Sequence, residues 1–202
     1  MKTLSMLLII VASLNVVIAQ DYSSAPDLER KEEAMYLRGN DVPYTGDYNL
    51  NHENGKPFIK GKYVNGLKEG TWVVYDSSGV LRSEESFVNN QWNGVRRTYH
   101  ASGQISTIEN FKAGLRSGMQ EGRYENGQLI FKVNHVNGLK EGKWVYYHTN
   151  GKPWEKGQFK NGKNEGKWTT YNENGKVTMV RKYKDGAQVS GPAIAKDAEA
   201  TY

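Results

Sequence analysis

The sequence predicts an all-β protein, an elongated single-layer stack of antiparallel β-hairpin repeats with about six 24-residue units and an N-terminal partial cap. The first observation is a complete series of glycines spaced 24 residues apart: Gly46, Gly70, Gly94, Gly118, Gly142 and Gly166. A second complete series lies nine residues further on: Gly55, Gly79, Gly103, Gly127, Gly151 and Gly175. Repetition at this length indicates stacked units, none of which can bury its own apolar face alone.

A third glycine series marks a second turn in every unit. It consists of Gly66, Gly114, Gly138, Gly162 and Gly186, with Asn90 at the one exception. Asn tolerates the left-handed conformation better than other residues that carry a side chain, so the exception still fits a turn. Asn-Gly pairs recur at both turn positions, and both residues of such a pair accept positive φ. No window shows a helical apolar stripe. Each unit is therefore expected to hold two strands joined by tight turns.

The chain begins with the pattern of a signal peptide. Lys2 is followed by an almost uninterrupted apolar run from Leu4 to Ala19, and Ala19 is a suitable residue before a cleavage site. The run is short for a membrane span and lacks a charged stop on its far side, although an uncleaved anchor remains the alternative. We therefore predict a cleaved signal peptide at 1–19 and a secreted or periplasmic protein, with no integral membrane span after cleavage.

The remaining boundaries follow from composition. Residues 20–33 are polar and charged and are predicted to form a flexible leader. Residues 34–44 contain a strand-like stretch and the turn Gly39-Asn40-Asp41, which fits a partial unit that caps the stack. The repeat domain is placed at 34–191, with the full repeats from residue 46. The tail at 192–202 has no pattern and is predicted to be disordered.

Aromatic residues recur in columns. One column is Tyr48, Trp72, Trp144 and Trp168, interrupted by Arg96 and Gln120; a second is Tyr75, Tyr99, Tyr147 and Tyr171; a third is Tyr63, Phe87, Phe111, Phe159 and Tyr183, interrupted by His135. Cross-strand aromatic neighbours stabilise a sheet by about 0.2–1 kcal/mol per pair. The Trp and Tyr of one strand are three residues apart, so either both faces carry aromatic columns or a bulge realigns them.

Composition excludes several classes of function. The chain contains no Cys, so disulfides, thiol catalysis and lipid attachment to Cys are ruled out. The net charge of +5 falls to +4 after signal cleavage, and we expect basic residues to alternate with acids along the repeats. Such a distribution does not resemble the clustered basic face that binds nucleic acid.

The repeat pattern resembles a known family. Gly70-Thr-Trp72-Val-Val-Tyr75-Asp-Ser-Ser-Gly79 is similar to the MORN-variant repeat, as are 142–151 and 166–175. This repeat occurs in exported bacterial proteins often labelled YwqK-type toxin–antitoxin antitoxins. The resemblance implies a β-hairpin array used for interaction or assembly. The antitoxin label implies little, because an exported protein is badly placed to neutralise a cytosolic toxin. The third and fourth copies depart from the pattern and are expected to be locally irregular or to present a different surface.

Few residues suggest chemistry. His52, His100 and His148 share one repeat position, but neighbours lie two repeats apart, roughly 20 Å, so a shared metal ion is not expected. We interpret them as surface turn residues, and His135 as a packed histidine. The recurring acids Glu69, Glu141 and Glu165 are interpreted as charged links, because no apolar pocket is visible that would raise the pKa of one of them. No enzyme activity, cofactor or metal is expected.

The remaining candidates for binding are the aromatic rows. The candidate binding residues are Trp72, Tyr75, Trp144, Tyr147, Trp168 and Tyr171. Such rows can bind a partner protein or sugar rings, unless they form the core of a thin body. We predict a scaffold for protein–protein interaction or assembly at the cell envelope, with an unknown protein partner. The alternative is a module that binds an envelope glycan. Open strand edges also allow end-to-end self-association.

Overall fold

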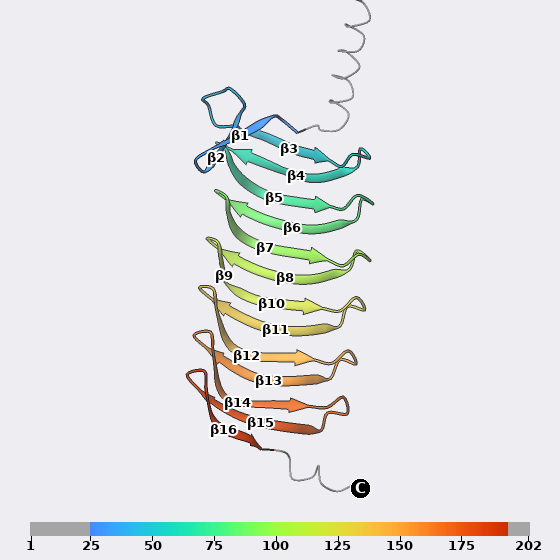
Figure 1. The fold of residues 1–202 in the computed structure, drawn as a ribbon, viewed down its shortest axis with the longest axis vertical. Helices are drawn as coiled ribbons and strands as arrows, with labels where there is room; N and C mark the ends of the chain where they lie inside the picture. The colour runs from blue at the N-terminus through green and yellow to red at the C-terminus, as the bar shows by residue number, and fades with distance from the viewer. Residues whose placement is uncertain (1–24, 194–202) are drawn as a thin grey trace, which may run out of the picture. The chain divides into compact units, whose positions relative to one another are not determined.

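The computed structural model describes residues 25–193, and every regular element within them is a β-strand (Figure 1). The predicted signal peptide at 1–19 lies outside these residues, as does most of the predicted tail. The chain divides into two compact units with the boundary between Gln91 and Trp92, and each unit is described by itself.

The first unit holds a small hairpin and a four-stranded antiparallel sheet. The hairpin pairs β1 (Leu28–Lys31) with β2 (Ala34–Leu37). The sheet strands lie side by side in chain order: β3 (Gly46–Asn51), β4 (Pro57–Val64), β5 (Leu67–Tyr75) and β6 (Leu81–Val88). Each pairs antiparallel with the next, as hairpin repeats require.

The second unit continues the same pattern over four hairpins, with β9 and β16 in addition. Its strands are β7 (Gln91–Tyr99), β8 (Ile105–Lys112), β9 (Leu115–Arg116), β10 (Gly118–Arg123), β11 (Leu129–Val136), β12 (Leu139–Tyr147), β13 (Pro153–Lys160), β14 (Lys163–Tyr171), β15 (Val177–Lys184) and β16 (Ala187–Ala193). They pair antiparallel in chain order, except that β8 contacts both β9 and β10. The predicted fold class, an all-β stack of hairpin repeats, is confirmed. The expected irregularity of the fourth copy is seen in the break between β9 and β10.

The two turns of each repeat differ in conformation. At the second turn, two consecutive residues have positive φ, as in Asn65 (50°) and Gly66 (76°), which is the conformation of a two-residue hairpin turn. Asn90 adopts φ 64° in place of glycine, as predicted. At the first turn only the glycine is left-handed, as in Gly55 (φ 78°). The prediction that both residues of Asn54-Gly55 have positive φ is therefore wrong, and the Asn54 side chain instead accepts the Lys56 amide.

A bend follows each second turn. In β5 the residues Leu67–Glu69 pair with β4, and the register then shifts by two residues around Gly70, which has φ 70°. Glycine takes a positive φ most readily, which explains five members of the first glycine series: Gly70, Gly94, Gly118, Gly142 and Gly166. Gly46, the first member, has an ordinary φ. Figure 1 shows β5 curving as it leaves the turn.

A second irregularity lies on the partner strand. Val74 faces Ser83 and Tyr75 faces Leu81, so Arg82 is the extra residue of a bulge. Because the bulge is on β6, β5 keeps its alternation, and Trp72 and Tyr75 lie on opposite faces. We call the face that carries Trp72 the aromatic face, and the other one the opposite face.

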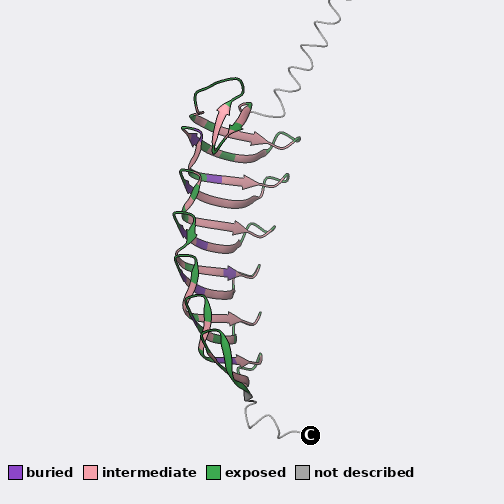
Figure 2. Ribbon diagram, turned by 60° about the vertical axis from the view of Figure 1, so that its left-hand side comes forward, coloured by how far each residue is buried: buried purple, intermediate pink, exposed green. Residues whose placement is uncertain are grey.

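The core lies on the aromatic face. Among its members Trp72, Trp168 and Val133 are 4%, 5% and 1% exposed. Rings of successive strands are in contact, for example Tyr63 with Trp72 (4.9 Å between centroids) and Phe159 with Trp168 (5.1 Å). In Figure 2 the buried residues recur from strand to strand within each unit. The side chains of the aromatic columns are therefore buried within a single layer, because each ring packs against the rings of neighbouring strands.

The N-terminal hairpin corrects one prediction. Leu28–Lys31 form β1, so the flexible leader predicted at 20–33 does not include these residues. Strand β2 lies against the first full repeat: the Met35 amide donates to the Gly66 carbonyl (2.9 Å), and the Tyr44 amide donates to the Met35 carbonyl (2.8 Å). This arrangement agrees with the predicted cap. At the other end, β16 extends to Ala193, two residues beyond the predicted boundary at 191.

Candidate functional site

The repeated histidines connect neighbouring hairpins. His52 Nε2 lies 3.0 Å from the carbonyl oxygen of Tyr75, and His148 Nε2 lies 2.9 Å from that of Tyr171. A carbonyl only accepts, so the imidazole donates in both cases. The interpretation as surface turn residues is correct in position, but these side chains are half-buried and join one repeat to the next.

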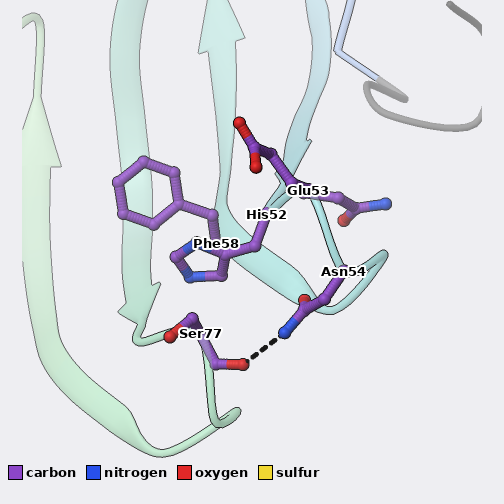
Figure 3. A pocket seen from close by; sticks show the side chains of 6 residues that line it. His52, Glu53, Asn54, Phe58 and Ser77 are labelled. Carbon is purple, nitrogen blue, oxygen red and sulfur yellow. Dashed lines mark hydrogen bonds between the residues drawn. The ribbon is translucent and has the colours of Figure 1, made fainter.

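The same turn forms a hollow of about 480 Å³ in the first unit. Figure 3 shows His52, Glu53, Asn54, Phe58 and Ser77 around it, with the Asn54 amide donating to the Ser77 carbonyl (2.7 Å). The His52 ring packs against Phe58 with 4.6 Å between centroids. The polar groups of His52 and Asn54 are thus already engaged with the backbone of the next hairpin, and the hollow is a by-product of this connection.

The recurring glutamates also have a structural role. Glu141 Oε2 accepts the backbone amide of Asn161 (2.8 Å), and Glu165 Oε2 accepts that of Asp185 (2.9 Å). Glu69 does the same for the amide of Asn89 at 3.1 Å. Each carboxylate therefore satisfies a turn amide twenty residues further along the chain. The predicted charged link is a hydrogen-bonded cap between consecutive repeats.

The six candidate binding residues are divided between the two faces. Trp72 and Trp168 are buried in the core, and Trp144 on the same face is half-buried. A ligand cannot reach the first two unless the side chains packed over them move. Lysines cover part of this face: Lys68 Nζ lies 4.4 Å from the Trp72 ring centroid, and Lys140 Nζ lies 5.0 Å from that of Trp144. Burial lowers the pKa of Lys68, and nearby Glu85 partly opposes the shift. Tyr75, Tyr147 and Tyr171 are half-buried on the opposite face.

The departures in the third and fourth copies form one polar cluster on the aromatic face. Glu109 is 3% exposed and lies between two arginines, with 2.8 Å to both Arg96 Nη1 and Arg116 Nε. Gln120 Nε2 donates to the same carboxylate at 3.1 Å. Burial alone would raise the pKa of Glu109, but the hydrogen bonds and charges of Arg116 and Arg96 outweigh it and lower the pKa.

His135 lies in the same region and replaces a column aromatic. It is 5% exposed, which agrees with the prediction of a packed histidine. Burial is the largest cause that lowers its pKa, followed by the positive charges of Arg116 and Lys140. The imidazole is therefore held neutral beside the Glu109 cluster, and the two together fill the gap in the aromatic columns.

Exposed aliphatic residues form a ridge beside the second turns of the second unit. Leu115, Val136 and Leu139 are 52%, 49% and 51% exposed. Val136 and Leu139 face each other across one turn, and Leu115 Cδ2 lies 3.7 Å from where a Cβ on Gly138 of that turn would stand. We call these three residues the apolar ridge. The sequence analysis missed the apolar ridge. A usable signal was present, because apolar residues directly beside Asn-Gly turns stand at exposed strand ends.

The described residues contain neither a metal-binding cluster nor a membrane-spanning helix. Residues 25–193 hold no group of three or more His, Cys, Asp and Glu placed to bind a metal ion. The same residues include no helix long and apolar enough to cross a membrane.

Comparison with known proteins gives one strong match. The family described as MORN repeat variant matches five consecutive segments, at residues 68–89, 92–113, 116–137, 140–161 and 164–185. Each segment is 22 residues long, so the match covers 110 of the 202 residues. The description names the repeat and no toxin or antitoxin. No curated protein matches this chain.

The solved structures that are similar to this chain include one with a low-level likeness. It is described as the crystal structure of accessory secretory protein 1, 2 and 3 in Streptococcus pneumoniae, with 18% sequence identity and a TM-score of 0.30. The similarity covers 62% of this chain and 22% of that chain, so this chain spans about a fifth of its length. So distant a likeness carries no conclusion about function.

Proposed function

Because the chain belongs to the MORN repeat variant family, we propose that it is a non-enzymatic scaffold that binds a protein partner at the cell envelope through the apolar ridge. The place of action rests on the signal-peptide pattern of residues 1–19. The binding role rests on the surface that remains after the repeats have been held together.

The repeated polar residues support a non-enzymatic role. The turn histidines donate to backbone carbonyls, and the recurring glutamates accept backbone amides. Each of these groups connects consecutive hairpins. The side-chain atom that makes the connection is therefore already occupied by a hydrogen bond to the backbone. The recurrence of these residues in several copies is explained by the construction of the array.

The apolar ridge is the observation that carries the proposal. When a partner covers exposed aliphatic side chains, their apolar surface is removed from water. This burial favours binding by a free energy of roughly 25 cal/mol per Å² of apolar surface. Leu115, Val136 and Leu139 are each about half exposed and lie together, whereas the aromatic residues Phe131, Trp144 and Phe159 pack in the core. The next repeat carries Lys163 at the position of Leu139, so the fold does not require leucine there.

Substitution of the ridge leucines by lysine tests the proposal. The variant Leu115→Lys/Leu139→Lys copies the residue that the chain already uses at position 163, and we expect its thermal unfolding to match that of the parent protein. A photo-crosslinking residue at position 136 is expected to give discrete crosslinked protein products, either with another protein or with a second copy. These products should disappear in the double lysine variant.

A crosslinking residue at Glu173, an exposed position in a first turn, serves as the control. If position 136 yields no product beyond those obtained at position 173, or if the products persist in the double variant, the apolar ridge is not the binding surface and the proposal fails.

A further inference from the structure

Positive charge is concentrated in the last repeats. Residues 139–193 contain eleven Lys and Arg against five Asp and Glu, a net charge of +6, while the whole chain carries +5. The expectation that basic residues alternate with acids along all repeats is therefore wrong for this part of the chain.

Four lysines of this segment lie on the opposite face of the sheet. Lys143, Lys156, Lys167 and Lys182 come from β12, β13, β14 and β15, and all four are exposed. Each adjoins a residue of the aromatic face, such as Trp168 next to Lys167, and alternation places the lysine on the other side. Lys167 and Lys182 are direct cross-strand partners. We call these four residues the lysine face.

Three acids of the same repeats are already engaged by other groups, although Glu165, the cross-strand partner of Gln158, lies on the opposite face as the lysines do. Glu141 and Glu165 accept turn amides, and Glu155 pairs with Arg181 (3.0 Å) on the aromatic face. Within the described part of the chain, none of the four lysines makes an ion pair. Like charges directly opposite one another destabilise a sheet, so the stability of the fold does not explain the pairing of Lys167 with Lys182.

The opposite face carries mixed charges in other repeats. Asp47 is the cross-strand partner of Lys62 in the first unit, and Glu121 pairs with Arg123 (2.6 Å) and Lys132 (3.2 Å) in the fourth copy. A surface whose charges serve only to keep the protein soluble carries charges of both signs. A face with an excess of one sign instead attracts an oppositely charged partner and raises its rate of association.

We propose that the lysine face docks an acidic segment of the protein partner whose apolar contacts are made at the ridge. This inference rests on the proposed function and specifies the chemistry of that partner. The two surfaces are close in sequence, because Leu139 and Lys143 both belong to β12. Leu139 Cδ2 also lies 3.4 Å from where a Cβ on Gly162 would stand, in a turn flanked by two further lysines, Lys160 and Lys163. Protein interfaces join an apolar centre to a charged rim, whereas an acidic polysaccharide has no aliphatic side chains to bury against Leu139.

Poly-L-glutamate is the probe for this inference, with binding measured by titration calorimetry at low and at physiological ionic strength. The full chain is expected to bind it, with affinity that falls as salt is raised. Lys167→Gln/Lys182→Gln should weaken binding by about tenfold, since two of the four charges are lost. The same variant removes a like-charge pair, so its thermal stability should be equal to or higher than that of the parent.

Lys60→Gln/Lys62→Gln is the matched control, because it removes two strand lysines of the opposite face from the first unit. It should leave the affinity within about twofold of the parent. Equal weakening by both double variants, or no binding of poly-L-glutamate, would overturn the inference. Tighter binding of polygalacturonate, single-stranded DNA or phosphatidylglycerol vesicles than of poly-L-glutamate would also overturn it. Crosslinking at position 136 is independent of these lysines, so it separates a failure here from a failure of the proposed function.

Discussion

Two glycines outside the turns explain how tryptophan fits into a single-layer sheet. A Cβ on Gly61 would lie 2.2 Å from the Trp72 ring, and one on Gly157 would lie 2.3 Å from the Trp168 ring. Both glycines have ordinary φ, so their role is to leave space and not to permit an unusual backbone. The indole therefore packs directly on the main chain of the neighbouring strand, which keeps Trp72 and Trp168 buried without a second layer.

The change Gly157→Ala tests this at the scale of one residue. The added methyl must displace the Trp168 ring, and we expect the free energy of unfolding to fall by about 1–3 kcal/mol, the usual cost of overpacking. Urea unfolding followed by tryptophan fluorescence measures the change. Gly191→Ala is the control, because a Cβ there meets no atom within 4 Å. Equal effects of the two substitutions would contradict the packing described here.

At the scale of elements, the third and fourth copies keep the strand pairing while exchanging the chemistry of their core. Arg96 stands where other copies have Trp, and its cross-strand partner is Glu109. The short strand β9 brings Arg116 to the same carboxylate. An aromatic contact is thus replaced by a buried ionic network, which holds the hairpins together only while Glu109 is charged and both arginines are in place.

Glu109→Gln tests the network through its pH dependence. Near neutral pH the variant should lose about 2–3 kcal/mol of unfolding free energy, less than for a fully buried pair because Arg116 is half exposed. The folded pKa of Glu109 is lowered, so its contribution is complete above the ordinary value of 4.5 and is lost as the pH falls through the folded pKa. The difference between parent and variant, measured by urea unfolding from pH 7 to pH 3, should therefore shrink in acid.

Glu173→Gln, which alters an exposed turn carboxylate, provides the comparison for this series. A deficit in Glu109→Gln that stays constant down to pH 3 would mean that the charge of Glu109 is not what joins Arg96 and Arg116.

At the scale of the whole molecule, each repeat is attached to its neighbours by a fixed set of connections. Within each unit, a strand of one repeat pairs with the next, a turn imidazole or amide donates to a carbonyl of the next repeat, and the second turn returns to the repeat before it. An array built in this way has a stability that is roughly a sum over repeats and the contacts between neighbours.

Deletion of residues 140–163 tests this additivity. The deletion removes one 24-residue period and joins Leu139 to Asn164, which occupies the repeat position of Lys140. We expect the shortened chain to keep its β-type circular dichroism per residue and to unfold at lower urea concentration, since one set of contacts between repeats is lost. Deletion of 140–151, half a period, removes most of β12 and the first turn, so that β13 directly follows a second turn, and should disrupt the second unit. Similar spectra from the two deletions would contradict the repeat as the unit of construction.

The sequence alone determined the repeat length, the all-β class, and the position of nearly every strand and turn. These features are local: positive φ at Asn65, Gly66 or Asn90 depends on a short stretch of chain, and its recurrence every 24 residues defines the hairpins. The packed position of His135 and the irregular fourth copy also followed from departures within the pattern. The conformation of the first turn was missed, because Asn54 uses its side chain to cap Lys56 where a left-handed backbone was expected.

Only the tertiary structure decided which residues hold the repeats together and which remain on the surface. The bulge lies on the partner strand, so β5 alternates regularly and Trp72 and Tyr75 lie on opposite faces. The pairing of distant strands brought Glu141 to the amide of Asn161 and Glu109 between two arginines. Such contacts depend on the register between residues seven to twenty-four positions apart. A side chain at a given repeat position can equally cap a turn, fill the core or face solvent until that register is fixed, and so the apolar ridge and the lysine face became visible only in the folded chain.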